Sequence, residues 1–158
     1  MEQFDVFIGE WTTEATHPAM PGVLVRGSAV IEWLEGERFL LIRARTDHPE
    51  FPDSLVVIGN MMQDRAKGRH AAAGRPESAG APPSPLQMHY FDSRGVFRDY
   101  ATRMTAQGWE YWREAGFPQR FTGQLAEGGR TIVGQSQLRG EDGQWTDDLT
   151  ITYRRAGR

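Results

Sequence analysis

The chain of 158 residues is 39% hydrophobic and 25% charged, which is ordinary for one soluble globular domain. Its formal net charge of −3 argues against a nucleic-acid-binding surface, which needs a concentrated basic stripe. The absence of cysteine excludes disulfides, zinc–thiolate sites, iron–sulfur clusters and a cysteine nucleophile. No run approaches the roughly 20 apolar residues that span a bilayer. We therefore expect a single cytoplasmic domain over residues 1–158, with no nucleic-acid or membrane partner and no cofactor.

The predicted elements begin with a short helical turn over Glu2–Phe7, in which Phe4 and Phe7 fall on one side. After this turn, short runs that alternate between apolar and polar residues are separated by turn signals containing glycine or proline. About ten short strands in succession, with no helices between them, favour an antiparallel meander. The strands expected from this pattern are Glu10–His17, Val23–Trp33, Arg38–Thr46, Ser54–Met61, Leu86–Asp92, Val96–Met104, Trp109–Glu114, Gln119–Leu125, Thr131–Leu138 and Trp145–Arg155.

One segment interrupts this rhythm. Residues 64–85, DRAKGRHAAAGRPESAGAPPSP, are rich in alanine, proline and glycine and show no apolar periodicity. Such a segment cannot bury enough apolar surface to offset the entropy lost on ordering. We expect a long flexible insertion loop here, whose role the sequence does not indicate.

The meander is expected to close on itself. The two outer strands of an open sheet are unpaired and invite aggregation, and closing the sheet into a barrel removes both edges. A barrel of about eight to ten strands is wide enough to hold one small ligand. We therefore predict an all-β fold, a closed antiparallel up-and-down β-barrel of about ten strands with a short N-terminal helical turn.

The start and the end of the chain carry a family resemblance. Gly9-Glu10-Trp11 leads the first strand, a string of hairpins follows, and arginine ends the last strand in TYRR. Together these features resemble the calycin superfamily, which contains lipocalins, fatty-acid-binding proteins and nitrobindin-like barrels. Stretches such as MHYFDSRGVFRDY and QRFTGQL look most similar to an uncharacterised bacterial branch of it. The resemblance implies that Trp11 packs structurally at the closed end of the barrel beneath an arginine. We assign that role to Arg154, with Arg155 as the alternative.

Histidines are the most adaptable acid–base groups, and four occur. His17 and His48 each precede a proline at the end of a predicted strand, where they suit either a turn or the rim of a barrel. His89 lies within a strand, and His70 lies in the long loop. No metal-binding motif, nucleophile elbow or phosphate-binding loop occurs, so no metal site is expected. Nitrobindin-like barrels bind haem through a histidine near the C-terminus; no histidine follows His89, which makes haem the less favoured reading.

Arginines that alternate with apolar residues suggest a pocket. If their strand faces point inward, several guanidiniums and rings surround one cavity, and a carboxylate could pair with them. The alternative is that these arginines lie on the outer wall, paired with Glu32, Asp99 and Glu110. The three faces are Phe39, Leu41 and Arg43; Val96, Arg98 and Tyr100; and Trp109, Tyr111 and Arg113. Our candidate ligand-binding residues are Arg43, His48, His89, Arg98, Tyr100 and Arg113.

Two functions follow from such a barrel. The first is non-enzymatic binding of a small, largely apolar ligand. The sequence leaves open whether this ligand also carries an acidic group. The alternative is a bacterial biosynthetic isomerase or cyclase that uses the cavity as its active site, with His89, Tyr100 or an arginine supplying acid–base or oxyanion help. A small molecule is the expected partner. Whether the chain also forms a homodimer is left open by the sequence.

Overall fold

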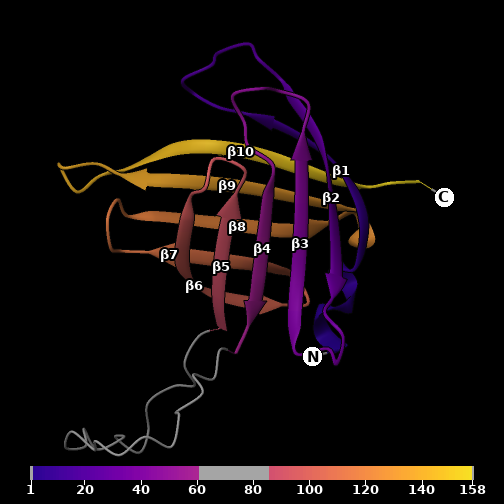
Figure 1. Cartoon of the computed structure of the whole chain (residues 1–158). Helices are drawn as coiled ribbons and strands as arrows, with labels where there is room; N and C mark the ends of the chain where they lie inside the picture. Colours follow the sequence, from indigo (N-terminus) through magenta and orange to yellow (C-terminus); the bar gives the residue numbers. More distant parts are fainter. Residues whose placement is uncertain (1, 61–85, 158) are drawn as a thin grey trace, which may run out of the picture.

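The structure is a computed structural model that describes residues 2–60 and 86–157, and its strands form one closed barrel (Figure 1). The predicted fold class is confirmed, and most predicted strands match the observed ones to within one or two residues. The predicted insertion loop at 64–85 lies outside the described residues. The elements are η1 (Glu2–Phe7), β1 (Gly9–Thr16), β2 (Val25–Trp33), β3 (Phe39–Thr46), β4 (Ser54–Gly59), β5 (Leu86–Asp92), β6 (Phe97–Thr105), β7 (Gly108–Arg113), β8 (Gln119–Ala126), η2 (Glu127–Gly129), β9 (Thr131–Arg139) and β10 (Trp145–Arg155).

Every strand pairs antiparallel with the next one along the chain, and β1 pairs with β10 to close the barrel. The closing register places Trp11 opposite Arg155 and Ala15 opposite Ile151. Closure leaves no strand edge unpaired among the described strands. This is the outcome expected from the tendency of unpaired outer strands to aggregate. Within the described residues, no helix is both long and apolar enough to cross a membrane.

The Gly-x-Trp motif builds the closed end. Trp11 Nε1 donates a hydrogen bond to the Phe7 carbonyl at 2.9 Å, which ties the first strand to η1. The guanidinium of Arg155 lies 4.3 Å from the Trp11 ring centre in a cation–π contact. Gly9 has φ of +136°, and a Cβ there would lie 2.9 Å from Arg155 Nη1. Glycine is therefore needed both for its backbone conformation and for the close approach of the guanidinium.

The arginine over Trp11 is Arg155, and this corrects the assignment to Arg154. Trp11 and Arg155 are direct partners in the β1–β10 ladder, so their side chains leave the sheet on the same face. Arg154 is one residue earlier, so it points to the opposite face and is exposed. The two arginines are chemically identical, so only the register of β10 against β1, which decides the face of each side chain, distinguishes them.

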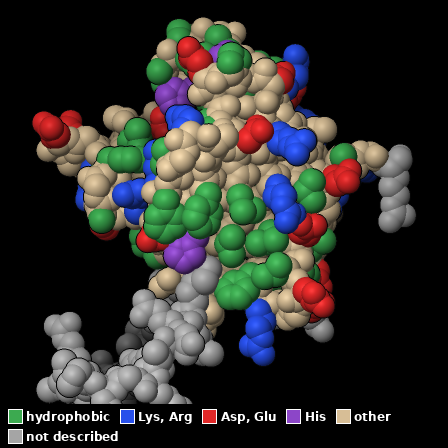
Figure 2. Space-filling model, viewed as in Figure 1, with side chains coloured by type: hydrophobic (Ala, Val, Ile, Leu, Met, Phe, Trp, Pro, Cys, Tyr) green, Lys and Arg blue, Asp and Glu red, His purple; other side chains and the backbone are tan. Residues whose placement is uncertain are grey.

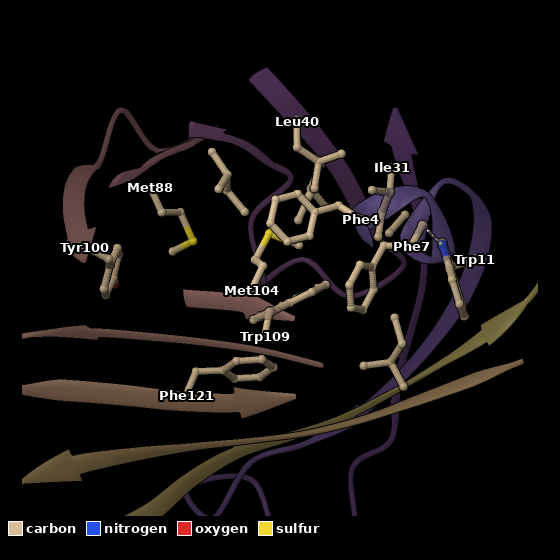
Figure 3. Packing of buried hydrophobic residues seen from close by; sticks show 14 residues of the cluster. Phe4, Phe7, Trp11, Ile31, Leu40, Met88, Tyr100, Met104, Trp109 and Phe121 are labelled. Carbon is tan, nitrogen blue, oxygen red and sulfur yellow. Dashed lines mark hydrogen bonds between the residues drawn. The ribbon is translucent and has the colours of Figure 1, made fainter. Parts of the chain in front are cut away.

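The apolar core fills the end of the barrel that η1 covers (Figure 3). A row of aromatic rings runs from this end toward the middle. Phe7 lies 5.7 Å from Trp109, Trp109 lies 5.8 Å from Phe121, and Phe121 stacks on Tyr111 at 4.8 Å between ring centres. The core cluster is Phe4, Phe7, Trp11, Ala29, Ile31, Leu40, Ile42, Ile58, Met88, Tyr100, Met104, Trp109, Phe121 and Ile132.

Two glycines make room for this row. Gly123 on β8 and Gly134 on β9 are direct partners, and the Phe121 ring lies against both. A Cβ on Gly134 would lie 2.4 Å from Phe121 Cζ, and one on Gly123 would lie 2.9 Å from Phe121 Cε1. Any larger residue would push the ring toward Tyr111, so the glycine pair sets the position of the rings at the centre of the barrel.

Candidate functional site

A cavity of about 530 Å³ lies at the end of the barrel away from η1. The inner faces of β5 to β10 form its walls, and the β1–β2, β3–β4 and β5–β6 connections surround its mouth. Its volume falls within the range of small-molecule sites. The lining residues are His17, Ala19, Met20, Glu50, Phe51, Pro52, Tyr90, Arg94, Arg98, Tyr100, Tyr111, Gln119, Ser136, Asp148 and Leu149.

Three tyrosines from neighbouring strands form the aromatic part of the cavity. Tyr90, Tyr100 and Tyr111 come from β5, β6 and β7, and the rings of Tyr100 and Tyr111 meet edge to face at 4.9 Å. Burial raises the pKa of Tyr111 well above its ordinary value, so this phenol stays protonated. The Tyr100 hydroxyl donates to Gln119 Oε1 at 2.7 Å. The result is an aromatic surface with polar atoms at its margin.

Arg98 brings positive charge to this surface. Its guanidinium carbon lies 5.7 Å from the Tyr90 ring centre and 4.9 Å from that of Phe117. Arg113 lies nearby, 5.0 Å from the Phe117 ring and 5.7 Å from that of Tyr100. Arg113 donates two hydrogen bonds to the Ala115 carbonyl, at 3.0 and 2.7 Å. Arg98, in contrast, makes no side-chain hydrogen bond or ion pair with any residue in 2–60 or 86–157.

A β-bulge brings an acidic residue into the cavity. The β9–β10 register shifts between Asp147 and Thr150, which gives β10 one extra residue opposite Ser136. Asp148 then points inward and accepts a hydrogen bond from His17 Nε2 at 2.7 Å, while Ser136 Oγ lies 3.3 Å from its other oxygen. His17 Nδ1 accepts a hydrogen bond from the Ala19 amide at 3.1 Å. Both imidazole nitrogens are therefore engaged, and the pair joins the β1–β2 connection to β10.

A second cluster holds the β5–β6 turn at the mouth. Asp92 accepts hydrogen bonds from Arg94 Nη2 at 2.7 Å, the Tyr90 hydroxyl at 3.1 Å and the Val96 amide at 3.2 Å. The bond from the Arg94 guanidinium is the main reason that the pKa of Asp92 falls to about 2. Burial raises the pKa of Tyr90 to about 12, so it remains a donor to Asp92 at neutral pH.

Asp92 is expected to make the barrel acid-sensitive. Its folded-state pKa of about 2 lies below the ordinary 3.8, so its stabilising effect is complete above pH 3.8 and is lost as the pH falls toward 2. Asp92→Asn should therefore be less stable than the wild type at pH 7 and lose less stability between pH 4 and pH 2. Urea unfolding across this range measures the slope. Asp142→Asn is the control, because Asp142 accepts an amide hydrogen bond from Gln144 in another turn without an arginine partner in the described chain. Equal slopes for Asp92→Asn and the wild type would contradict the prediction.

The structure places two of the six candidate ligand-binding residues, Arg98 and Tyr100, in the cavity wall. Arg113 lies beside them and contacts the Tyr100 ring without lining the cavity. His48 lies in the β3–β4 connection, where its ring meets Phe51 edge to face at 5.6 Å. Phe51 itself lines the cavity, so His48 is separated from the interior by one ring.

Arg43 and His89 are corrected to the outer wall. On β3 the inward residues are Leu40, Ile42 and Ala44, and Arg43 points outward to pair with Glu32. The outer face that carries β3 to β5 shows basic and acidic side chains side by side (Figure 2). His89 lies between the inward Met88 and Tyr90, so it also points outward.

His89 pairs on the outer wall with Asp99 and stacks on Phe97 at 5.7 Å. A haem inside the barrel could not use His89, and His17 offers no free nitrogen. Neither His89 nor His17 thus offers a nitrogen to a haem inside the barrel, and the described residues contain no group of three acidic, cysteine or histidine residues able to hold a metal ion.

Several cavity residues were not predicted from the sequence. Gln119, Ser136 and Asp148 are polar residues in strands, and His17 was considered only as a turn or rim residue. Gln119 could have been found because it lies two positions before the inward Phe121 on β8, and alternate residues of a strand share a face. Ser136 lies four positions after the inward Ile132 on β9, so the same rule places it on the inner face. Asp148 could not, because the bulge reverses the alternation of β10 at that point.

Comparison with known proteins supports the fold. No family model matches the chain, and no curated protein matches it. The structure is similar to Rv2717c from M. tuberculosis, with a TM-score of 0.61 and 10% identity over 99% of this chain and 96% of that one. It is also similar to the S-type phycobiliprotein lyase CPES from Guillardia theta, with a TM-score of 0.50 and 10% identity over 99% and 92% of the two chains. At this identity the likeness concerns the fold alone, a closed antiparallel β-barrel.

Proposed function

We propose that the protein binds a small, largely apolar ligand in the barrel cavity. The observation that carries this proposal is the 530 Å³ cavity, walled by three tyrosine rings beside an arginine with no protein acceptor in the described chain. Concave sites with aromatic walls and a few polar groups are typical of small-molecule binding. The calycin-like fold is consistent with this use.

Binding is favoured over catalysis by the state of the polar groups. An isomerase or cyclase that abstracts a proton needs a base free to meet the substrate, and the bases enclosed by this cavity are engaged. In the cavity, His17 is bonded at both nitrogens, Asp148 accepts from His17, and the raised pKa values of Tyr90 and Tyr111 prevent either phenol from acting as a base at neutral pH. The phycobiliprotein lyase among the similar structures is an enzyme by its name, but a shared fold does not transfer an activity.

The test uses N-phenyl-1-naphthylamine, an uncharged probe whose fluorescence rises in apolar surroundings. The wild type should bind it saturably. Gln119→Trp places an indole in the cavity and should weaken binding by at least about tenfold, equal to about 1.4 kcal/mol. Arg120→Trp is the matched control, because Arg120 is the next residue of β8 and is exposed. Equal binding by the wild type and Gln119→Trp would refute the cavity as the site.

A further inference from the structure

We propose that the ligand of this cavity is a compact planar carboxylate, whose acid group docks on Arg98 and whose ring lies against Tyr100 and Tyr111. This inference rests on the proposed function and adds the chemical class of the ligand, its orientation and its size. Three observations carry it: a guanidinium without a partner among residues 2–60 and 86–157, the neighbouring amide, and the packed core beneath the tyrosines.

Arg98 is held in place without using its hydrogen-bond donors. The rings of Tyr90 and Phe117 contact the guanidinium, and the contact to Phe117, at 4.9 Å, lies well within cation–π range. Neither ring accepts a conventional hydrogen bond from it. An arginine is always charged and presents a planar set of N–H donors that matches the two oxygens of a carboxylate. Arg94, the other arginine in the cavity wall, is already paired with Asp92.

Gln119 offers a second donor next to Arg98. Its Oε1 atom accepts from the Tyr100 hydroxyl, which leaves the Nε2 hydrogens without a partner in the described residues. Tyr100 lies two positions from Arg98 on the same face of β6, so Gln119 and Arg98 border the same part of the wall.

The negative charges at the cavity do not cancel Arg98. Asp148 is engaged by His17 at 2.7 Å and by Ser136. Glu50 lies exposed on the β3–β4 connection, where water and salt screen its charge. An anionic group therefore has one favourable place in the cavity, at Arg98, near the mouth.

The depth of the cavity limits the rest of the ligand. Arg98 and Tyr100 are two residues apart, about 7 Å along an extended strand. Beyond Tyr100 and Tyr111 the barrel is filled by Met104, Trp109 and Phe121 (Figure 3). A long acyl chain has no channel to enter, whereas one or two fused rings can lie flat against the tyrosines. The space thus selects a short, flat molecule with its acid toward the mouth.

Titration calorimetry with 2-naphthoate and 2-naphthamide tests the inference, because the two probes share one ring system and differ at a single group, a carboxylate in one and an uncharged amide in the other. The wild type should bind the acid at least about tenfold more tightly than the amide. Arg98→Gln should remove this preference, because it weakens binding of the acid much more than binding of the amide. Arg43→Gln, which alters an arginine on the outer wall, should retain it. Thermal unfolding of each variant confirms that it is folded.

Each remaining outcome has a definite meaning. Equal binding of acid and amide by the wild type, or an acid preference that survives in Arg98→Gln, overturns the role of Arg98 and leaves the proposed function standing. Binding of hexadecanoate as tightly as 2-naphthoate overturns the size limit. If N-phenyl-1-naphthylamine binds and neither naphthalene probe does, only this inference fails. If none of the probes binds, the proposed function fails with it.

Discussion

Replacing Arg155 with leucine is expected to lower the free energy of unfolding by about 3 kcal/mol. Arg155 Nε donates to the Gly129 carbonyl at 2.9 Å, Nη1 donates to the Ile8 carbonyl at 2.8 Å, and Nη2 donates to the Val6 carbonyl. One side chain thus ties the last strand to η1, to the residue between η1 and β1, and to the β8–β9 connection, while covering the Trp11 ring. Leucine removes these bonds and leaves partly buried carbonyls without a donor. Urea unfolding at neutral pH measures the loss.

Arg154→Leu provides the matched control for this prediction. The two arginines are neighbours on β10 and have the same chemistry, but the Arg154 side chain is exposed. The bond that Thr12 makes to residue 154 uses the backbone carbonyl, so it survives the substitution. The expected change is within about 0.5 kcal/mol, as for most surface substitutions. Equal losses in the two variants would show that charge or strand propensity at the C-terminus, and not the closure of the barrel by Arg155, explains the effect.

The barrel itself could be predicted from the sequence because its signals are local and repeated. Alternating strands and glycine-containing turns specify hairpins, and the edge argument then requires closure. The resemblance carried by Gly9 and Trp11 added the structural role of the tryptophan, which the contacts of Trp11 with Phe7 and Arg155 now explain.

Which side of each strand faces inward was harder to predict. β3 opens with four consecutive apolar residues, Phe39–Ile42, so its sequence does not reveal which alternate set is buried, and it left both faces open for Arg43. His89 and Tyr90 are adjacent on β5, where only the pairing with neighbouring strands shows that Tyr90 is the inward residue. The bulge at Asp148 depends on the β9–β10 register, which no local pattern encodes.

Phe7→Ala is expected to destabilise the protein by about 4 kcal/mol, the magnitude typical of removing a buried aromatic side chain. Phe7 is 0% exposed and plugs the closed end of the barrel. It is also the first ring in the row that continues through Trp109 and Phe121 to Tyr111 (Figure 3). Rigid strands surround the site, so the hole left by alanine cannot collapse fully. Denaturant unfolding gives the loss of stability.

The matched control is Phe91→Ala, which removes the same side chain from a place on β5 where it is 42% exposed. Its expected cost is about 1 kcal/mol, because much of its apolar surface already meets water. Tryptophan emission adds a second readout: Phe7→Ala should shift it to the red as the packing around Trp11 and Trp109 loosens, and Phe91→Ala should not. If the two alanine variants lost the same stability, η1 would be a loosely attached cover. The floor of the cavity would then be held by the strands alone.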